Sequence, residues 1–216
     1  YVKARGEVMK QSKKIIFAFL SFLLSSCTSP SIIKSPSTEK NFQCKLVGAT
    51  ARLRNQNLVQ YPGLLTASIG HRVKFGIKKF DRSVLRFWIK FNPRSALLDP
   101  LEKPAVILKL YSKGQQVQSY RLPDGQKYEG FTSPDKFKQE GLSYEDIWPA
   151  GRYLGEKAVS FEVQQEQFEQ LLRSDSVEFI IQTQYDPLIV SLEKEDFSPL
   201  LDFKKVCLSQ SIGEKN

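Results

Sequence analysis

Histidine, methionine and cysteine are nearly missing from this 216-residue chain, which contains one His, one Met and three Cys. A Ser-His-acid triad would have to use His71, and no Gly-x-Ser-x-Gly turn accompanies it. So few His and Cys residues also exclude zinc clusters and iron–sulfur centres. Phosphate-binding glycine loops, dinucleotide fingerprints and EF-hand loops are absent from the sequence as well. We therefore expect no cofactor, no metal site and no catalytic residues.

Apolar, aromatic and basic residues are plentiful. Hydrophobic residues make up 41% of the chain and aromatic residues 12%, enough to bury a sizeable core, which excludes intrinsic disorder. The net charge is +9, and the first 26 residues supply +4 of it, with five basic residues against one acidic residue. The composition indicates a single globular domain that follows a basic N-terminal segment.

The N-terminal segment has the organisation of an export signal. Met9 precedes a basic stretch that ends at Lys14, and Ile15 to Leu24 is an apolar run interrupted only by Ser21. As a helix this run would span about 15 Å, half of the roughly 30 Å core of a bilayer. It is therefore too short for a transmembrane helix and is typical of a signal peptide. We interpret residues 1–8 as an upstream extension and residues 9–26 as the signal peptide.

Leu24-Ser25-Ser26-Cys27 closes this segment and resembles the lipobox of bacterial lipoprotein precursors. The resemblance implies that the Cys27 thiol receives a diacylglyceryl group and that a signal peptidase cuts before Cys27. It also implies acylation of the new amino group. Two or three acyl chains, at about 0.8 kcal/mol per buried methylene, would hold the protein on a membrane. The alternative is an ordinary secretory signal in which Cys27 is an incidental thiol.

Residues 27–41 would then comprise the lipidated cysteine and a polar tether rich in Ser, Thr and Pro. As a flexible coil, such a tether reaches on the order of 20 Å. In lipoproteins of Gram-negative bacteria, an Asp directly after the acylated Cys resembles an inner-membrane retention signal, and this chain has Thr28 there. The resemblance therefore implies the periplasmic face of the outer membrane, with the membrane itself as a partner through the anchor.

Period-two alternation dominates from Phe42 to about residue 122, and residues 42–216 are expected to form a single, mainly β domain. Short helices are expected at 165–173 and after Ser198-Pro199, the second with Leu200, Leu201, Phe203 and Cys207 facing inward. Short connections favour antiparallel pairing. The expected fold is an antiparallel β-sandwich or curled sheet with a short helix and a C-terminal helix. The predicted strands are 44–53, 72–80, 84–91, 105–111, 116–122, 159–163, 177–185 and 188–192.

Cys44 and Cys207 remain once Cys27 is lipidated, and they form an even pair in an oxidising compartment. A bridge between them would tie both ends of the domain together and close a loop of about 160 residues, which stabilises by roughly 5 kcal/mol. The alternative is two buried free thiols. We favour the disulfide.

Basic residues alternate with apolar residues on three strands, 72–80, 84–91 and 105–111. If these strands pair with one another, the basic side chains gather on one solvent face. That face would attract an anionic lipid or an acidic partner, or it would simply be solvated and would guard the strands against edge pairing. The residues of this predicted basic face are Arg72, Lys74, Lys78, Arg86, Lys90 and Lys109.

Residues 123–157 break the alternation with glycines, prolines and aromatics, and we predict a long aromatic loop there. It is a candidate ligand-binding loop, or a surface loop that packs over one end of the sheet. The alternative function is that of a glycan hydrolase, which would require two carboxylates of this segment at a suitable separation. The carboxylates available are Asp135, Glu140, Glu145 and Asp146. The candidate ligand contacts are Tyr128, Phe131, Tyr144, Trp148 and Tyr153.

These observations favour a membrane-anchored, non-enzymatic lipoprotein of the bacterial cell envelope that is structural or binds a partner or ligand. The expected partner is an envelope protein, an anionic lipid or a glycan. Nucleic acid is not expected, because no recognition helix is visible in an exported chain. The alternative is an envelope hydrolase that uses carboxylates of 123–157.

Overall fold

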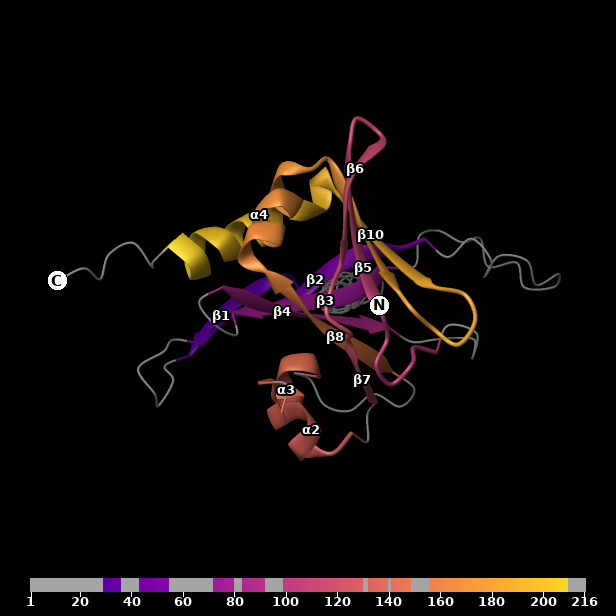
Figure 1. Cartoon of the computed structure of the whole chain (residues 1–216). Coiled ribbons are helices and arrows are strands. Elements are labelled where there is room, and N and C mark those ends of the chain that lie inside the picture. The colour runs from indigo at the N-terminus through magenta and orange to yellow at the C-terminus, as the bar shows by residue number, and fades with distance from the viewer. Residues whose placement is uncertain are drawn as a thin grey trace, which may run out of the picture.

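The computed structural model describes residues 29–35, 43–54, 72–79, 83–91, 99–129, 132–139, 141–148 and 156–209. It confirms the predicted fold class, because the chain forms a curled antiparallel sheet with a few short helices (Figure 1). The strands are β1 Ser31–Ser35, β2 Gln43–Leu53, β3 Arg72–Lys79, β4 Val84–Phe91, β5 Val106–Ser112, β6 Gln115–Arg121, β7 Gln126–Glu129, β8 Lys157–Gln164, β9 Ser176–Ile181 and β10 Leu188–Glu193. The helices are α2 Pro134–Gln139, α3 Tyr144–Ile147, α4 Gln165–Arg173 and α5 Ser198–Phe203, with the 3₁₀ turn η3 Lys194–Phe197 before α5 and the π-helical turn η4 Lys204–Leu208 after it.

Nine strands follow one another across the sheet in the order β6-β5-β9-β10-β2-β3-β4-β8-β7, and β1 pairs with β2 beside this path. The curl brings the two ends of the order together. The backbone N–H groups of Leu122, Gly125 and Lys127 donate to carbonyls of residues 106, 104 and 102 at 2.8 to 3.0 Å. The segment that leads from β6 into β7 therefore pairs with the segment that leads into β5.

The main core lies inside this curl and explains the alternation along the strands. In β4, Leu85, Phe87 and Ile89 point inward and are each 1% exposed. The ring of Phe87 lies 5.7 to 6.0 Å from the rings of three other core phenylalanines on β8, α4 and β9. Helix α4 and the C-terminal helical segment lie on one side of the sheet, and α2 and α3 lie on the other (Figure 1).

A second, smaller core occupies the opposite face of the sheet. Trp88 of β4 and Ala158 of β8 meet aromatic and aliphatic side chains of the segment 126–148. The prediction of a long loop over 123–157 is therefore wrong for the described residues, since that segment contains β7, α2 and α3. Helices of six and four residues are too short to leave a helical period in the sequence. The cluster consists of Trp88, Tyr128, Phe137, Leu142, Ile147, Trp148 and Ala158.

The strand order corrects another expectation. β3 pairs with β4 as predicted, but β5 pairs with β6 and β9 and not with β4. The neighbour of β4 is instead β8, which returns from much later in the chain. Short connections had suggested that strands adjacent in sequence are adjacent in space, and the connection from β4 to β5 departs from that rule.

Both ends of the domain also differ in detail from the expectation. The strand β1 lies within the segment predicted to be a tether, and its Ile32 packs against the main core. In the C-terminal helical segment, Leu200, Phe203 and Cys207 are buried, but Leu201 is 51% exposed. No helix in the described part of the chain is long and apolar enough to cross a membrane.

Gly76 provides a direct test of the β3–β4 register. It lies opposite Trp88, and a Cβ atom at Gly76 would stand 2.1 Å from Cζ2 of that ring and 2.8 Å from the carbonyl oxygen of Leu46. Gly76→Ala is expected to lower the free energy of unfolding by about 1 to 3 kcal/mol, as measured by urea denaturation. Combining it with Trp88→Leu is expected to cost less than the sum of the two single changes, and strict additivity would contradict the contact.

Candidate functional site

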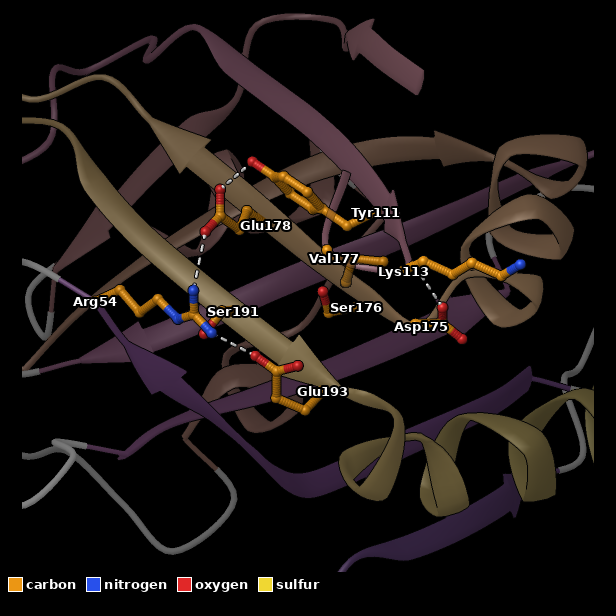
Figure 2. Close-up of a pocket in the computed structure, with 10 residues that line it drawn as sticks. Arg54, Tyr111, Lys113, Asp175, Ser176, Val177, Glu178, Ser191 and Glu193 are labelled. Atoms are coloured by element: carbon orange, nitrogen blue, oxygen red, sulfur yellow. Dashed lines mark hydrogen bonds and ion pairs between the residues drawn. The ribbon is translucent and has the colours of Figure 1, made fainter. Parts of the chain in front are cut away.

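A cavity of about 380 Å³ opens on the outer face of the sheet, over β5, β9 and β10 (Figure 2). It is lined mainly by polar and charged side chains. Its boundary is formed by Arg54, Tyr111, Lys113, Gly114, Asp175, Ser176, Val177, Glu178, Ser191 and Glu193.

Strand alternation explains why these side chains meet. In β9, Val177 and Phe179 face the core, so Glu178 between them faces outward. In β10, Ser191 faces outward by the same alternation, and the register places it directly opposite Glu178. Tyr111 of β5 faces the same side. The cavity floor is therefore the outer surface of three neighbouring strands.

Arg54, just after β2, joins two carboxylates above this floor. Its guanidinium forms an ion pair with Glu178 at 3.6 Å and a second ion pair with Glu193 (Figure 2). Arg54 is half-exposed, whereas the Glu178 side chain is 17% exposed. The Arg54 guanidinium therefore bridges the two carboxylates and lies partly in solvent, above the more buried Glu178.

The Tyr111 hydroxyl donates a hydrogen bond of 2.7 Å to Oε2 of Glu178. Burial, the hydrogen bond to Glu178 and the negative charge of that carboxylate raise the pKa of Tyr111 to about 12. The phenol therefore remains protonated, and remains a donor, throughout the physiological pH range.

Ser191 is the most unusual polar residue of the cavity. The residue is 1% exposed, and within the described part of the chain its buried Oγ has no hydrogen-bond partner. A buried hydroxyl without a partner costs about 1 to 3 kcal/mol, and native proteins contain few such groups. The Oγ atom is covered by protein atoms and is therefore not presented to the cavity.

Asp175, at the other end of the cavity, has a structural task. Its carboxylate accepts the backbone N–H of Lys113 at 2.9 Å and the hydroxyl of Ser112 at 3.3 Å. Lys113 and Gly114 both have positive φ, of 51° and 75°, as a two-residue hairpin turn requires. The hydrogen bond from the Lys113 backbone lowers the pKa of Asp175, so this carboxylate stays charged and holds the turn between β5 and β6.

The predicted disulfide is present. Cys44 at the start of β2 is bonded to Cys207 in η4, with a Cα–Cα separation of 5.7 Å. The predicted lipidation residue Cys27 lies outside the described residues, as do Phe131 and Tyr153 of the predicted ligand loop.

The other predicted ligand contacts do not line the cavity. Tyr128 and Trp148 are 0% and 1% exposed, and Tyr144 packs against the Trp148 ring at a centroid distance of 5.3 Å. Trp148 Nε1 donates to Glu156 at 3.1 Å. These aromatics serve the second core, as the packing interpretation of 123–157 had proposed.

The predicted basic face is wrong as a solvent-exposed surface. Lys78, Arg86 and Lys90 are buried at 6 to 8% exposure, while Lys74 of β3 is exposed. Lys109 lies on β5, opposite Glu178, away from the others. Arg72 is opposite Arg52 in the register, and its side chain lies outside the described residues.

Each buried base has an acidic partner from a neighbouring segment. Lys78 pairs with Asp146 at 3.2 Å, Arg86 with Glu162 at 2.7 Å and Lys90 with Glu156 at 3.5 Å. Burial lowers the pKa of Lys90, against the opposing charge of Glu156. The period-two pattern thus correctly predicted that Lys74, Lys78, Arg86 and Lys90 share one face of the sheet, but three of these four side chains are buried.

Sequence reasoning assigned no role to the cavity residues. The sequence signal for these residues is the polar alternation Ser176-x-Glu178 and Ser191-x-Glu193. Such alternation is ordinary for strands with one solvent-exposed face. Only the pairing of β5, β9 and β10 shows that these positions meet and that one hydroxyl is buried.

The cavity offers hydrogen-bond donors and acceptors at fixed positions, with charges that balance locally. Within the described ranges, no group of three His, Cys, Asp or Glu side chains is placed to hold a metal ion. Comparison with protein-family models, with curated proteins and with solved structures finds no match to this chain.

Proposed function

We propose that this chain is a non-enzymatic, lipid-anchored protein of the bacterial cell envelope and that its β domain binds a ligand at the cavity over β5, β9 and β10. The cavity on the outer face of three neighbouring strands, where Arg54, Tyr111 and Glu178 meet, carries the binding role.

The anchor rests on the lipobox-like Leu24-Ser25-Ser26-Cys27. The Cys44–Cys207 disulfide supports export, because disulfides persist in oxidising compartments such as the periplasm. The outer membrane's periplasmic face is the proposed location, on the basis of Thr28 after the cysteine.

Strand β1 gives the anchor a geometric consequence. It begins at Ser31, four residues after Cys27, and four residues span at most about 14 Å when fully extended. The domain would therefore stand close to the lipid surface and not at the end of a long tether. Such a position suits a ligand or partner that is itself part of the envelope.

Asp146, one of the four carboxylates considered for the hydrolase alternative, does not support it. Asp146 is buried and engaged by two lysines, Lys45 at 2.7 Å and Lys78 at 3.2 Å, and Trp148 beside it is buried too. A carboxylate in that position is a structural group and has no access to a glycan.

Replacing the proposed acceptor tests the anchor. Cys27→Ser is expected to abolish incorporation of labelled palmitate and to leave uncleaved precursor or soluble protein, because serine supplies no thiol for the diacylglyceryl group. The readouts are radiolabel on the purified chain and its intact mass. Ser29→Ala, which leaves the lipobox and the disulfide intact, is the control and should keep the label. Unlabelled wild-type protein in the soluble fraction would contradict the proposal.

A further inference from the structure

We propose that the open edge of β6 pairs with β6 of a second copy of this chain, so that the two sheets join across a two-fold axis. This inference goes beyond the proposed function and does not depend on the lipid anchor. It follows from the exposure of β6, from the direction of its backbone groups and from the composition of the strand.

Strand β6 is the last strand in the order of the sheet, and among the described strands it pairs only with β5. Side chains on both of its faces are exposed, and of its seven residues only Tyr120 is partly covered. Figure 1 shows the tip of the β5–β6 hairpin projecting beyond the rest of the sheet. The side of β6 that faces away from β5 is therefore open to another strand.

The hydrogen bonds of the hairpin show which backbone groups lie on the open side. The N–H of Leu122, one residue after β6, donates to the carbonyl of Val106 at 2.9 Å. In an antiparallel pair, residues that bond the neighbouring strand alternate with residues whose backbone groups point away from it. Tyr120 therefore bonds β5, whereas Ser119 and Arg121 direct their N–H and C=O groups to the open side.

The strand lacks the charged residues and prolines that guard natural edge strands against pairing. Residues 115–120 read Gln-Gln-Val-Gln-Ser-Tyr and contain neither. Arg121 carries the charge of β6, and Asp124 pairs with it at 3.3 Å. The β-bulge of this hairpin lies beyond Gln118, toward the turn, so the run Gln118–Arg121 keeps a regular ladder. This run can accept a further strand without opposing charges.

Self-pairing about Ser119 suits this edge. A two-fold axis there places Ser119 opposite Ser119 of the second copy, and each donates its N–H to the other's carbonyl. Tyr120 then lies opposite Gln118 of the second copy, and Val117, which is 57% exposed, lies opposite the aliphatic stem of Arg121. The two Arg121 residues are about 13 Å apart along the strands, so like charges are not opposed. Because each copy contributes the same edge, the contact closes as a dimer.

A single added strand is a small interface. Stable interfaces bury about 1,200 to 2,000 Å², more than one seven-residue edge supplies. We therefore expect a weak, reversible dimer in solution. Copies anchored to one membrane would pair more fully, because confinement raises their effective concentration.

Cross-linking tests the pairing at the axis. In the full chain with Cys27→Ser, Ser119→Cys supplies the single free thiol, because Cys44 and Cys207 are bridged. The two Cα atoms at the axis would be about 5.5 Å apart, as a disulfide requires. The matched control is Gln115→Cys, on the same exposed strand. Its two thiols would lie about 26 Å apart, so oxidation should link the Ser119→Cys chains at least about tenfold faster, as read on non-reducing gels.

A backbone variant tests the same edge without a thiol. Ser119→Pro removes an N–H that points away from β5, so the hairpin should keep its ladder and Tm should stay within about 4 °C of the wild-type value. In sedimentation equilibrium of the full chain in detergent, the wild type should show a reversible dimer and Ser119→Pro should be monomeric. Ser119→Ala, which keeps the N–H, is the control and should dimerise as the wild type does.

Three results would overturn the inference: equal cross-linking rates at positions 119 and 115, a wild-type chain that stays monomeric at its highest soluble concentration, or a dimer that persists in Ser119→Pro. Binding of an unrelated extended peptide to β6 without self-association would also contradict it. The cross-linking comparison decides the question by itself if Ser119→Pro unfolds the hairpin.

Discussion

Removing the Cys44–Cys207 disulfide is expected to lower the free energy of unfolding by about 5 kcal/mol if the bond acts through chain entropy alone. The bridge spans 163 residues, and the entropy that it removes from the unfolded chain grows with the length of the closed loop. It joins the first long strand, β2, to the last helical turn, η4. Few domains of this size retain their stability after such a loss.

The measurement is urea unfolding of the protein with and without dithiothreitol, and of the double variant Cys44→Ala/Cys207→Ala. Cys44 and Cys207 are 3% and 8% exposed, so the reductant should be added under unfolding conditions. Cys27→Ser is the control for a cysteine outside the bridge and should keep the wild-type midpoint. An unchanged midpoint in the double variant would contradict the expected effect.

Strand positions could be predicted from the sequence, because burying one face of a strand makes apolar and polar side chains alternate along it. β3, β4 and the helix α4 lie where the alternation and the helical spacing placed them. The disulfide followed from an even pair of cysteines in an exported chain. These features depend on local pattern and on composition, which a single sequence carries.

The partners of each strand could not be predicted in the same way. The pattern of β4 shows that Arg86 and Lys90 share a face, but not whether that face meets water. Their acidic partners, Glu162 on β8 and Glu156 just before it, come from much later in the chain. The cavity is hidden for the same reason, because Ser191 and Glu178 are neighbours only through the β9–β10 register.

Asp146 joins α3 to the sheet through two lysines, and its replacement is the second large effect that we expect. Its side chain is 3% exposed and accepts Lys45 at 2.7 Å and Lys78 at 3.2 Å. It also caps α3, by accepting the backbone N–H of Ser143 at 2.7 Å. Asp146→Ala should lower the free energy of unfolding by about 3 to 5 kcal/mol, because it leaves a buried lysine without its counter-ion.

The pH dependence of stability should report the same carboxylate. Burial alone would raise the pKa of Asp146, but the hydrogen bond from Lys45, the charge of Lys78 and the Ser143 N–H outweigh it and hold that pKa below its usual range. A depressed folded-state pKa stabilises the fold above the unfolded pKa of about 4. This contribution is lost as the pH falls through the lower, folded value. In Asp146→Asn the corresponding loss should be absent, since the amide does not titrate.

Asp135→Asn is the matched control for this carboxylate. Asp135 also belongs to the α2–α3 layer and pairs with a lysine, Lys138, but its side chain is 84% exposed. An exposed pair of this kind contributes little, so the change should alter the free energy of unfolding by less than about 0.5 kcal/mol and leave the acid profile unchanged. Equal effects of Asp135→Asn and Asp146→Asn would mean that the buried lysines do not rely on Asp146. The α2–α3 layer would then be held to the sheet by its aromatic core alone.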